Sequence, residues 1–298
     1  MIEIYEVNKK LGDKQILKDV KIKIDKGSIF GLIGPNGAGK TTLIRCLTGI
    51  YKVDKGNVQV NGQEVFDNSS VKKIIGYVAD DNSYLSTFKV KEMIKFYELS
   101  YESFSRERFN ELNKIFQISE KTTIKKLSKG MKMRLSIMLN LSIMPEVLIL
   151  DEPTSGLDPI IKKKVLSLLM EDAAERGTTV FISSHNLSDL ERICDSVAIM
   201  NRGEIKYCNS IEDMKRNIRK IQVVFKENAP VDLASWKEII SVSQIGRVYN
   251  IITKEYTEEL KSKLSGENIV FAEEIDLSLE DMFIYSIEGE EGYEEIFK

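Results

Sequence analysis

A glycine-rich segment holds the residues best suited to chemistry. It fits the pattern G-x-x-x-x-G-K-[ST] and consists of Gly34, Pro35, Asn36, Gly37, Ala38, Gly39, Lys40, Thr41 and Thr42. Glycines let such a loop wrap its backbone N–H groups around a phosphate, in conformations that a Cβ atom would obstruct. Lys40 would reach the β- and γ-phosphates, and the Thr41 hydroxyl can ligate Mg²⁺. The segment therefore predicts a site for a nucleoside triphosphate with Mg²⁺.

Two adjacent carboxylates follow an apolar run further along the chain. Residues 147–150 are Val-Leu-Ile-Leu, which predicts a buried strand, and Asp151 and Glu152 come directly after it. The carboxyl end of such a strand lies beside the phosphate loop in open α/β sheets. We expect Asp151 to hold Mg²⁺ through its water shell and Glu152 to orient and deprotonate a water. An acidic turn that merely closes a strand is the alternative, and the upstream loop argues against it.

The elements around these residues predict an α/β fold. A short apolar run over 28–33 enters the glycine-rich loop, and a helical pattern follows it and stops at Gly49. The first 65 residues otherwise predict strands, with a hairpin at Asn61-Gly62. Residues 87–144 have a helical pattern, and a strand, helix and strand over 147–183 predict a parallel sheet. Beyond residue 211, short strands at 221–225, 248–252 and 269–272 alternate with helices and predict a small α+β domain.

Composition argues against several classes of protein, namely nucleic-acid-binding, membrane-spanning and disulfide-rich proteins. The net charge of −3 gives no field that favours nucleic-acid binding, and we expect the basic run Lys162 to Lys164 to be a solvated helix face. No stretch approaches the roughly 20 apolar residues of a membrane span, so we expect no crossing of a bilayer by this chain alone. The start lacks the pattern of a signal peptide. Three cysteines without a CxxC pair favour reduced thiols over disulfides or a metal site.

Further motifs, in a fixed order, resemble the ATP-binding cassette of ABC transporters over about residues 1 to 210. The segment Leu127, Ser128, Lys129, Gly130 and Met131 looks like the signature sequence of that family. Asp151 to Thr154 looks like its extended Walker B segment, and Ser155 to Asp158 like its D-loop. His185, the only histidine, follows a predicted strand at the position of the switch histidine.

The resemblance implies a fold, a reaction and a partner for each site. The fold would be a P-loop NTPase core at 1–210, with an N-terminal antiparallel β subdomain and a helical subdomain at about 86–145, followed by a small accessory domain at 211–298. The activity would be ATP hydrolysis with Mg²⁺. His185 would contact the γ-phosphate, and Ser128 and Gly130 of a second cassette would close the site. Taken alone, the signature segment would predict only a helix cap, and a lone histidine is usually structural.

Four residues depart from the pattern of the family. Lys129 replaces a glycine and Met131 a glutamine, which adds a charge near the phosphates across a dimer interface and removes a polar contact. Asp80 replaces the glutamine expected after the strand at 75–78, so it becomes a candidate ligand of Mg²⁺, as does Asp81. Leu11 stands where an adenine-stacking aromatic is expected, which predicts weaker stacking and looser selection of ATP over GTP.

A cassette without a membrane span implies a separate partner that spans the membrane. We expect an integral membrane transporter subunit, a second cassette in a homo- or heterodimer, a location at the cytoplasmic face of the cell membrane, and no nucleic acid. Motion would pass through the segment around residues 83–101. The tail, including 277–283, resembles that of antibiotic and multidrug exporters. The alternatives are a soluble ABC ATPase acting on DNA or ribosomes, and a nucleotide-sensing subunit with little hydrolysis.

Overall fold

The N-terminal sheet is antiparallel. The computed structural model describes residues 1–298 apart from 82–85, 218, 228, 254–255, 267–268 and 281–298. Within it, β1 (Ile2–Leu11), β2 (Lys14–Ile24), β4 (Lys55–Val60) and β5 (Gln63–Glu64) form a sheet of order β2-β1-β4-β5. Alternation of buried isoleucines with exposed lysines over Val20–Ile24 gives β2 one wet face, as predicted. Asn61 and Gly62 have φ of 53° and 73°, so the predicted hairpin joins β4 to β5.

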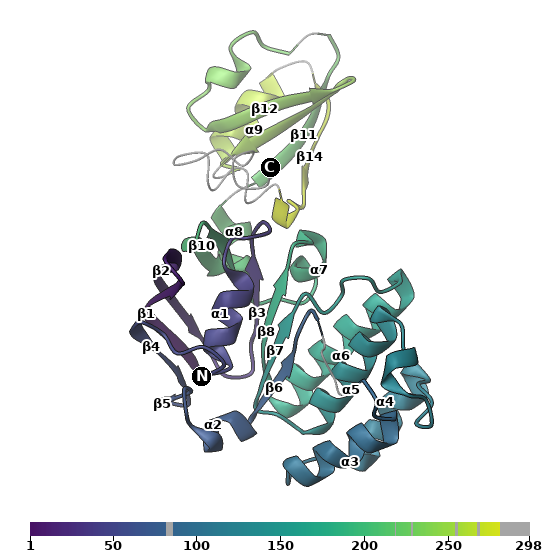
Figure 1. The fold of residues 1–298 in the computed structure, drawn as a ribbon. Helices are drawn as coiled ribbons and strands as arrows, with labels where there is room; N and C mark the ends of the chain where they lie inside the picture. The colour runs from purple at the N-terminus through teal and green to yellow at the C-terminus, as the bar shows by residue number, and fades with distance from the viewer. Residues whose placement is uncertain (82–85, 218, 228, 254–255, 267–268, 281–298) are drawn as a thin grey trace. The chain divides into compact units, whose positions relative to one another are not determined.

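The central sheet carries the phosphate loop. Its order is β10-β9-β3-β8-β7-β6, and the pairings of β3 with β8 and β9, of β7 with β8, and of β6 with β7 are parallel. The strands are β3 (Ile29–Ile33), β6 (Ile75–Val78), β7 (Val147–Asp151), β8 (Thr179–Ser184), β9 (Ser196–Asn201) and β10 (Glu204–Ser210). Figure 1 shows β3, β8, β7 and β6 side by side. These parallel pairings confirm the predicted parallel sheet. As is usual for such sheets, β3, β7 and β8 are buried along their whole length.

Four helices flank these strands. They are α1 (Lys40–Leu47), α2 (Ser69–Lys73), α6 (Pro159–Arg176) and α7 (Leu187–Glu191). α1 ends at Thr48, and Gly49 follows with φ of 64°, the left-handed conformation that terminates a helix. α6 begins at the N-cap Asp158 and ends at Gly177, whose φ is 68°. The predicted helix end at Gly49 is therefore confirmed, and α6 ends in the same way.

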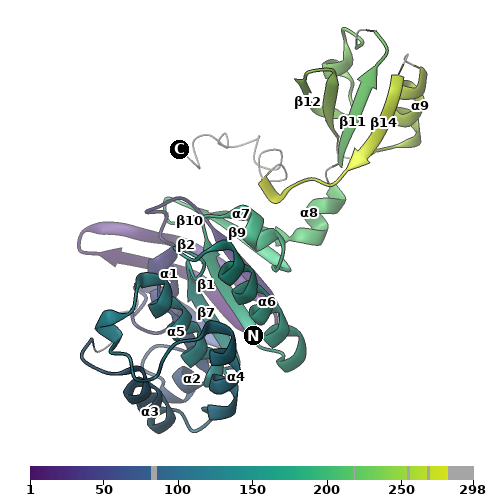
Figure 2. The ribbon, with the colours of Figure 1, turned by 90° about the vertical axis from the view of Figure 1, so that its right-hand side faces the viewer.

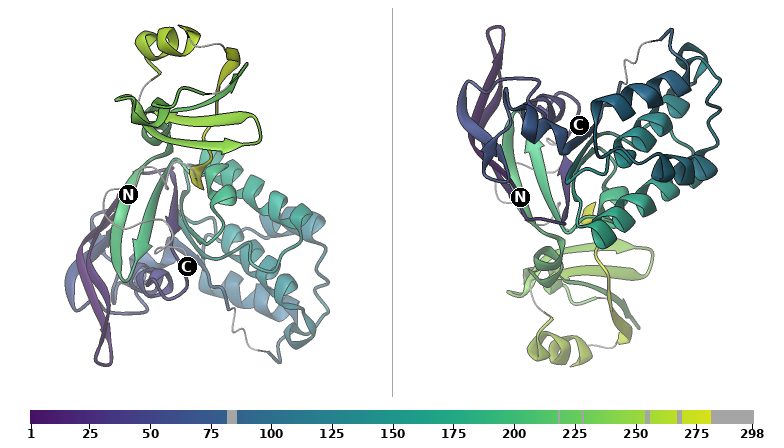
Figure 3. Two further views of the ribbon diagram at one scale, coloured as in Figure 1. Left: turned by 90° about the horizontal axis from the view of Figure 1, so that it is seen from above. Right: turned by 90° about the horizontal axis from the view of Figure 1, so that it is seen from below.

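A helical segment is inserted between β6 and β7. It comprises α3 (Val90–Ser100), α4 (Arg106–Phe116), the 3-10 turn η1 (Ile124–Lys126) and α5 (Lys129–Ser142). Figures 2 and 3 show these helices grouped together on one side of the central sheet. From Met133 onward α5 is almost entirely buried, as its apolar pattern predicts. The side chain of Asn140 accepts a hydrogen bond from the backbone N–H of Tyr77 at 2.9 Å, which attaches α5 to β6.

One buried carboxylate links the helical segment to α6. Asp172 accepts a hydrogen bond from the Arg108 guanidinium at 2.9 Å, and the Nε atom of Arg176 lies 3.5 Å from its second oxygen. Burial raises the pKa of the Asp172 carboxyl above its ordinary value, although the two arginines act in the opposite direction. The folded protein therefore tolerates a charge on Asp172 only while its arginine partners are in place.

Replacing Arg108 with methionine is expected to lower the free energy of unfolding at neutral pH by about 3 kcal/mol, because a buried carboxylate loses a partner. Because the pKa of Asp172 is higher in the folded than in the unfolded protein, its contribution to the free energy of unfolding is fully present below the unfolded pKa. That contribution is lost as pH rises through the folded pKa. The deficit should therefore shrink when urea unfolding is repeated at acidic pH, where Asp172 becomes protonated in the folded state. Lys114→Met, an exposed change on the same helix, should stay within about 0.5 kcal/mol of wild type. An equal loss in both variants would contradict the assignment.

The chain divides into two compact units, Met1–Cys208 and Asn209–Lys298. The second has an antiparallel sheet of order β12-β13-β11-β14 with apolar residues of α9 packed against it. Its elements are α8 (Ile211–Asn217), β11 (Arg219–Phe225), η2 (Leu233–Ser235), β12 (Ile239–Ile245), β13 (Val248–Thr253), α9 (Glu258–Gly266) and β14 (Ile269–Ile275). The predicted fold class is confirmed. Of the tail at 277–283, residues 281–283 lie outside the described residues. In the part of the chain that the structure describes, every helix is too short or too polar to span a bilayer.

Candidate nucleotide site

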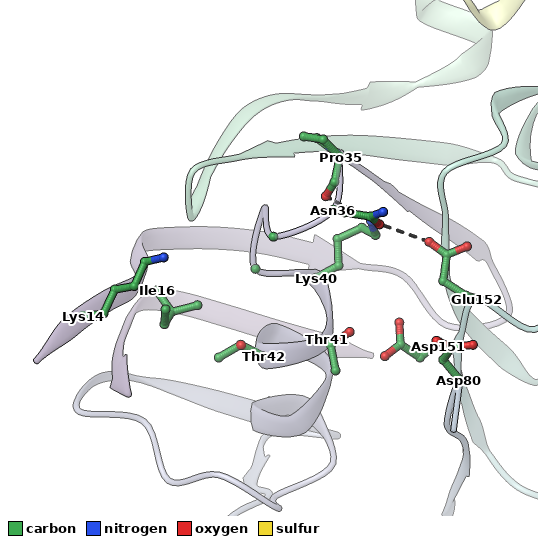
Figure 4. A pocket seen from close by; sticks show the side chains of 12 residues that line it. Lys14, Ile16, Pro35, Asn36, Lys40, Thr41, Thr42, Asp80, Asp151 and Glu152 are labelled. Atoms are coloured by element: carbon green, nitrogen blue, oxygen red, sulfur yellow. Dashed lines mark hydrogen bonds and ion pairs between the residues drawn. The ribbon is translucent and has the colours of Figure 1, made fainter. Parts of the chain in front are cut away.

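The glycine-rich loop joins β3 to α1 and forms the wall of a pocket of about 320 Å³. Figure 4 shows the side chains around it. The pocket is lined by Lys14, Ile16, Pro35, Asn36, Gly37, Gly39, Lys40, Thr41, Thr42, Asp80, Asp151 and Glu152. The structure thus brings the predicted loop, the acidic pair and Asp80 together around one cavity.

Two glycines of the loop are required by their surroundings. A Cβ atom on Gly34 would overlap the carbonyl oxygen of Met200. Gly39 has φ of 112°, which L side chains rarely adopt, and an added Cβ would lie 3.1 Å from Leu17. The absence of side chains at these positions lets the loop pack closely against β9 and β2, and α1 begins directly after it. A helix N-terminus that follows such a loop favours a bound anion.

Lys40 is the cation at the centre of the pocket. Its side chain is only 7% exposed, and its ammonium group donates to the Gly34 carbonyl oxygen at 2.6 Å. The same nitrogen lies 3.6 Å from a carboxylate oxygen of Glu152 (Figure 4). A third oxygen, the carbonyl of Pro35, lies at 3.4 Å, so the three donors of the ammonium group all face oxygen atoms, and a phosphate would replace the longer of these contacts.

The acidic pair lies where β7 ends. Asp151 is buried and accepts a hydrogen bond from the Ser183 hydroxyl at 2.6 Å, and the same hydroxyl accepts from the Glu152 N–H at 3.0 Å. Sequence reasoning missed Ser183, although it directly opposes Asp151 in the register of β7 and β8. Glu152 has φ of 50°, an unfavourable conformation for a non-glycine residue. Such strain persists only where the surrounding structure enforces it, and it is common at functional sites.

His185 lies against Glu152. Its Nδ1 atom is 2.8 Å from the second carboxylate oxygen of Glu152, and its side chain is 64% exposed. The ring therefore has one nitrogen engaged with Glu152, and its exposure leaves the other open to a ligand.

The signature segment begins α5. Ser128 is its N-cap, and its hydroxyl accepts from the Met131 N–H at 3.2 Å. Ser128 and Lys129 are exposed, and neither lines the pocket of its own chain. The Lys129 ammonium instead pairs with Asp80 at 3.1 Å, so two of the residues that depart from the family pattern contact one another. The D-loop residue Asp158 caps α6 by accepting from the N–H groups of Ile160 and Ile161.

The wall opposite the acidic pair differs from the sequence expectation. Ile16 and Lys14 of β2 line the pocket, whereas Leu11 is exposed at the end of β1. This wall of the pocket therefore carries an aliphatic side chain from β2 and not the residue at position 11. The signal available in the sequence was the alternation of residues along β2. Ile16 directly precedes Leu17, the first buried residue of the strand, and so points to the other side of the strand.

The pocket suits a divalent cation with a preference for oxygen. Thr41 faces Asp151 across it, and Asp80 lies beside Asp151 (Figure 4). Hydroxyl and carboxylate oxygens are the ligands that Mg²⁺ prefers, usually together with water and phosphate oxygens. Among the residues that the structure describes, no cluster of three or more acidic, histidine or cysteine side chains forms a complete metal cage. Thr41 and Asp151 supply two oxygens of the kind that Mg²⁺ binds, which fits an ion held together with water and a phosphate ligand.

Comparison with known proteins decides the family. Residues 17–155 match the family model described as ABC transporter. The ABC transporter ATP-binding protein YtrB of Bacillus subtilis is 33% identical over 290 residues, which span 97% of this chain and 99% of the relative. The chain belongs to the ABC transporter family. It is an ATP-binding subunit of that family and an ATPase.

Two further relatives extend the likeness of this ABC subunit. The bacitracin transport ATP-binding protein BcrA of Bacillus licheniformis is 32% identical, over 97% of this chain and 98% of the relative. A solved structure described as an ATP-binding subunit of an ABC transporter superposes with a TM-score of 0.67 at 26% identity, covering 72% of this chain and 92% of that chain. The ABC ATPase fold of the first unit is thus shown by structure as well as by sequence.

Proposed function

We propose that this ABC subunit drives export through a separate membrane partner, by a cycle in which ATP joins two cassettes and hydrolysis releases them. The observation that carries the proposal is the single pocket that holds the glycine-rich loop, Lys40 and the pair Asp151 and Glu152. Each of these residues has a distinct part in binding or cleaving a triphosphate.

The pocket supports a division of roles. The loop Gly34–Thr42 would surround the phosphates with N–H groups, and Lys40 would pair with the β- and γ-phosphates. Thr41 and Asp151 would hold Mg²⁺, which supplies charge neutralisation on the phosphate oxygens when it is bound. Glu152 would accept a proton from the attacking water, since its carboxylate lies at the same wall.

His185 would position the γ-phosphate. The contact of its Nδ1 atom at 2.8 Å fixes the ring against Glu152. The remaining ring nitrogen would face a phosphate oxygen, so the ring would lie between Glu152 and the γ-phosphate. The ring would thereby couple the γ-phosphate to the orientation of Glu152.

A second cassette would complete the site. Ser128, Lys129 and Gly130 lie at the exposed start of α5, where a hydroxyl, backbone N–H groups and the helix dipole favour an anion. Because they lie outside the pocket of their own chain, the γ-phosphate that they reach would belong to a partner, and Leu127 and Met131 would anchor the segment. Sedimentation of Glu152→Gln with Mg-ATP should show a dimer. Ser128→Arg should abolish the dimer without weakening ATP binding to the monomer, and a dimer that persists would contradict this arrangement.

The Asp80–Lys129 pair predicts a measurable effect of Mg²⁺. Asp80 lines the pocket, and its carboxylate is shared with Lys129. Replacing Lys129 with glutamine should free Asp80 for the cation and lower the Mg²⁺ concentration for half-maximal ATPase activity by about two- to five-fold, the scale of an exposed ion pair. Lys126→Gln, another exposed change near the start of α5, should leave the Mg²⁺ dependence unaltered. An unchanged Mg²⁺ titration in Lys129→Gln would remove Asp80 from the metal site.

A surface of the helical segment suits the membrane partner. Phe96 and Leu99 of α3 are 52% and 80% exposed. Beside them lies a groove lined by Ser69, Lys72, Lys73, Phe96, Ser100 and Tyr101. Exposed apolar side chains at a groove with a polar rim are typical of interaction sites. The predicted contact region at 83–101 overlaps this surface, and its residues 83–85 lie outside the described residues.

Co-purification from membranes tests the partner. Tagged wild-type protein should recover an integral membrane protein, whereas Phe96→Glu together with Leu99→Glu should lose it and still bind ATP. Met170→Glu changes an exposed apolar residue of α6 and serves as the matched control. Repeated recovery of no membrane protein would refute the transporter role and favour a soluble ATPase that acts on DNA or ribosomes.

Export rather than import is supported by the second unit. The likeness to the bacitracin transport protein spans 97% of this chain, so it extends through most of the second unit, Asn209–Lys298. We therefore assign an antibiotic or similar amphipathic compound as the cargo class, with the subunit bound at the cytoplasmic face of the membrane. Deletion of the gene should sensitise cells to such a compound and raise its retention. Reduced uptake of a nutrient in place of that phenotype would favour import.

A further inference from the structure

A buried carboxylate outside the nucleotide pocket links three segments that follow strands β7 and β8 of the central sheet. Asp189 lies in α7, and its side chain is only 7% exposed. Its Oδ2 atom lies 2.6 Å from the ammonium group of Lys162 and accepts a hydrogen bond from the hydroxyl of Thr154 at 3.3 Å. The predicted solvated face at Lys162 is therefore wrong for this residue, because α7 packs an acidic partner against it.

Each segment carries a residue of the proposed mechanism. Thr154 follows Glu152 by two positions, and the intervening turn is closed by a hydrogen bond from the Ser155 N–H to the Glu152 carbonyl oxygen at 3.0 Å. Lys162 lies in the first turn of α6, four residues after its N-cap Asp158. Asp189 follows His185 by four positions. Asp189, in the segment of the switch histidine, thus contacts both Thr154 of the Walker B segment and Lys162 of the helix after the D-loop.

The energetics make this junction rigid. Thr154 is buried together with Asp189, so their hydrogen bond is shielded from water. If Asp189 lost its contact with Lys162, its carboxylate would stay desolvated without the attraction of a cation. Conformations that keep this contact are therefore favoured over those that break it. Displacement of any one segment would therefore strain the other two.

We propose that Asp189 is a positioning residue for ATP hydrolysis. Through Thr154 and Lys162 it holds the segments of Glu152, Asp158 and His185 in one register, so that the water-activating carboxylate, the D-loop and the switch histidine move together when a γ-phosphate binds. This inference rests on the proposed roles of Glu152 and His185. It assigns no contact between Asp189 and the nucleotide.

The consequence is a separation of turnover from binding. Lys40 and the glycine-rich loop make their contacts without Asp189. Asp189→Asn keeps the shape of the side chain and removes its charge, so it should lower kcat by about 10- to 100-fold through misplacement of Glu152. The affinity for Mg-ATP should change by less than about two-fold, within the usual effect of a substitution away from the ligand.

Variants of the partners extend the test. Thr154→Val removes only the hydroxyl and should lower kcat by a smaller factor of about 3- to 10-fold. Lys162→Met should lower kcat strongly in the wild-type background and little in the Asp189→Asn background, since coupled residues are not additive. Asp189→Glu should restore part of the activity lost in Asp189→Asn. Lys163→Met, an exposed neighbour, is the control and should match wild type.

The experiment measures kcat, KM, ATP affinity and thermal stability for the full chain with these changes. A lower kcat with unchanged affinity, partial rescue by Asp189→Glu and non-additive effects of Lys162→Met would support the proposal. Wild-type kcat in folded Asp189→Asn and Thr154→Val would overturn it. Wild-type turnover in Glu152→Gln would instead overturn the proposed catalytic roles, so the two failures are distinguishable.

Discussion

Glu152→Gln is expected to retain ATP binding and to lose turnover by about 10²- to 10⁴-fold, the usual contribution of a general base. The amide preserves the volume and the hydrogen-bonding reach of the side chain, yet it cannot take a proton from water. It also removes one negative charge at 3.6 Å from Lys40. Because that charge repels phosphates, the affinity for ATP should stay equal or increase.

The measurements are steady-state phosphate release and equilibrium binding of Mg-ATP. Glu175→Gln, an exposed change on α6, is the matched control and should keep full activity. The conformation at this residue adds a second expectation. Since Glu152 has φ of 50°, Glu152→Gly should be tolerated by the backbone and still be inactive. Wild-type turnover in Glu152→Gln would move the base to another residue.

Lys40→Ala is expected to weaken the binding of the nucleotide itself, by on the order of 10- to 100-fold, because charge-assisted hydrogen bonds are worth about 1.5–3 kcal/mol. Its ammonium group is buried beside the loop, so no solvent cation replaces it well. Turnover should also collapse, since the charge that neutralises the γ-phosphate is lost. Isothermal titration with a non-hydrolysable ATP analogue measures the affinity directly.

Lys14→Ala provides the comparison for that loss. Lys14 lines the same pocket but is exposed at its rim, where salt screens its charge. It should weaken binding by only about two- to five-fold, and its effect should fade at high ionic strength. If Lys40→Ala and Lys14→Ala behaved alike, the loop would not be the phosphate site.

The sequence predicted the fold best at positions where the backbone conformation admits few residue types. Gly39 adopts a φ of 112°, and Asn61 and Gly62 both adopt positive φ, so these turns follow from local chemistry. The burial of α5 and of β7 follows from their apolar patterns in the same way. These features depend on neighbouring residues or on a short repeat, which a sequence displays directly.

The features that sequence reasoning missed depend on residues far apart in the chain. Ser183 supports both acidic residues only because β8 pairs with β7 in a particular register. Ile16 lines the pocket because β2 folds back over the loop. Lys162 was expected in solvent, and the packing of α7 gave it a buried partner at 2.6 Å.

The sequence by itself determined the phosphate loop, the acidic pair, the order of the motifs and therefore the family, because backbone conformation and charge at those positions are set by local residue types. Only the tertiary structure decided the strained backbone of Glu152, the contact of His185 with it, the Asp80–Lys129 pair and the junction at Asp189. Each of these arises where strands and helices from distant parts of the chain meet at the carboxyl edge of one sheet. Distances between such segments are consequences of packing, which no short pattern of residues encodes.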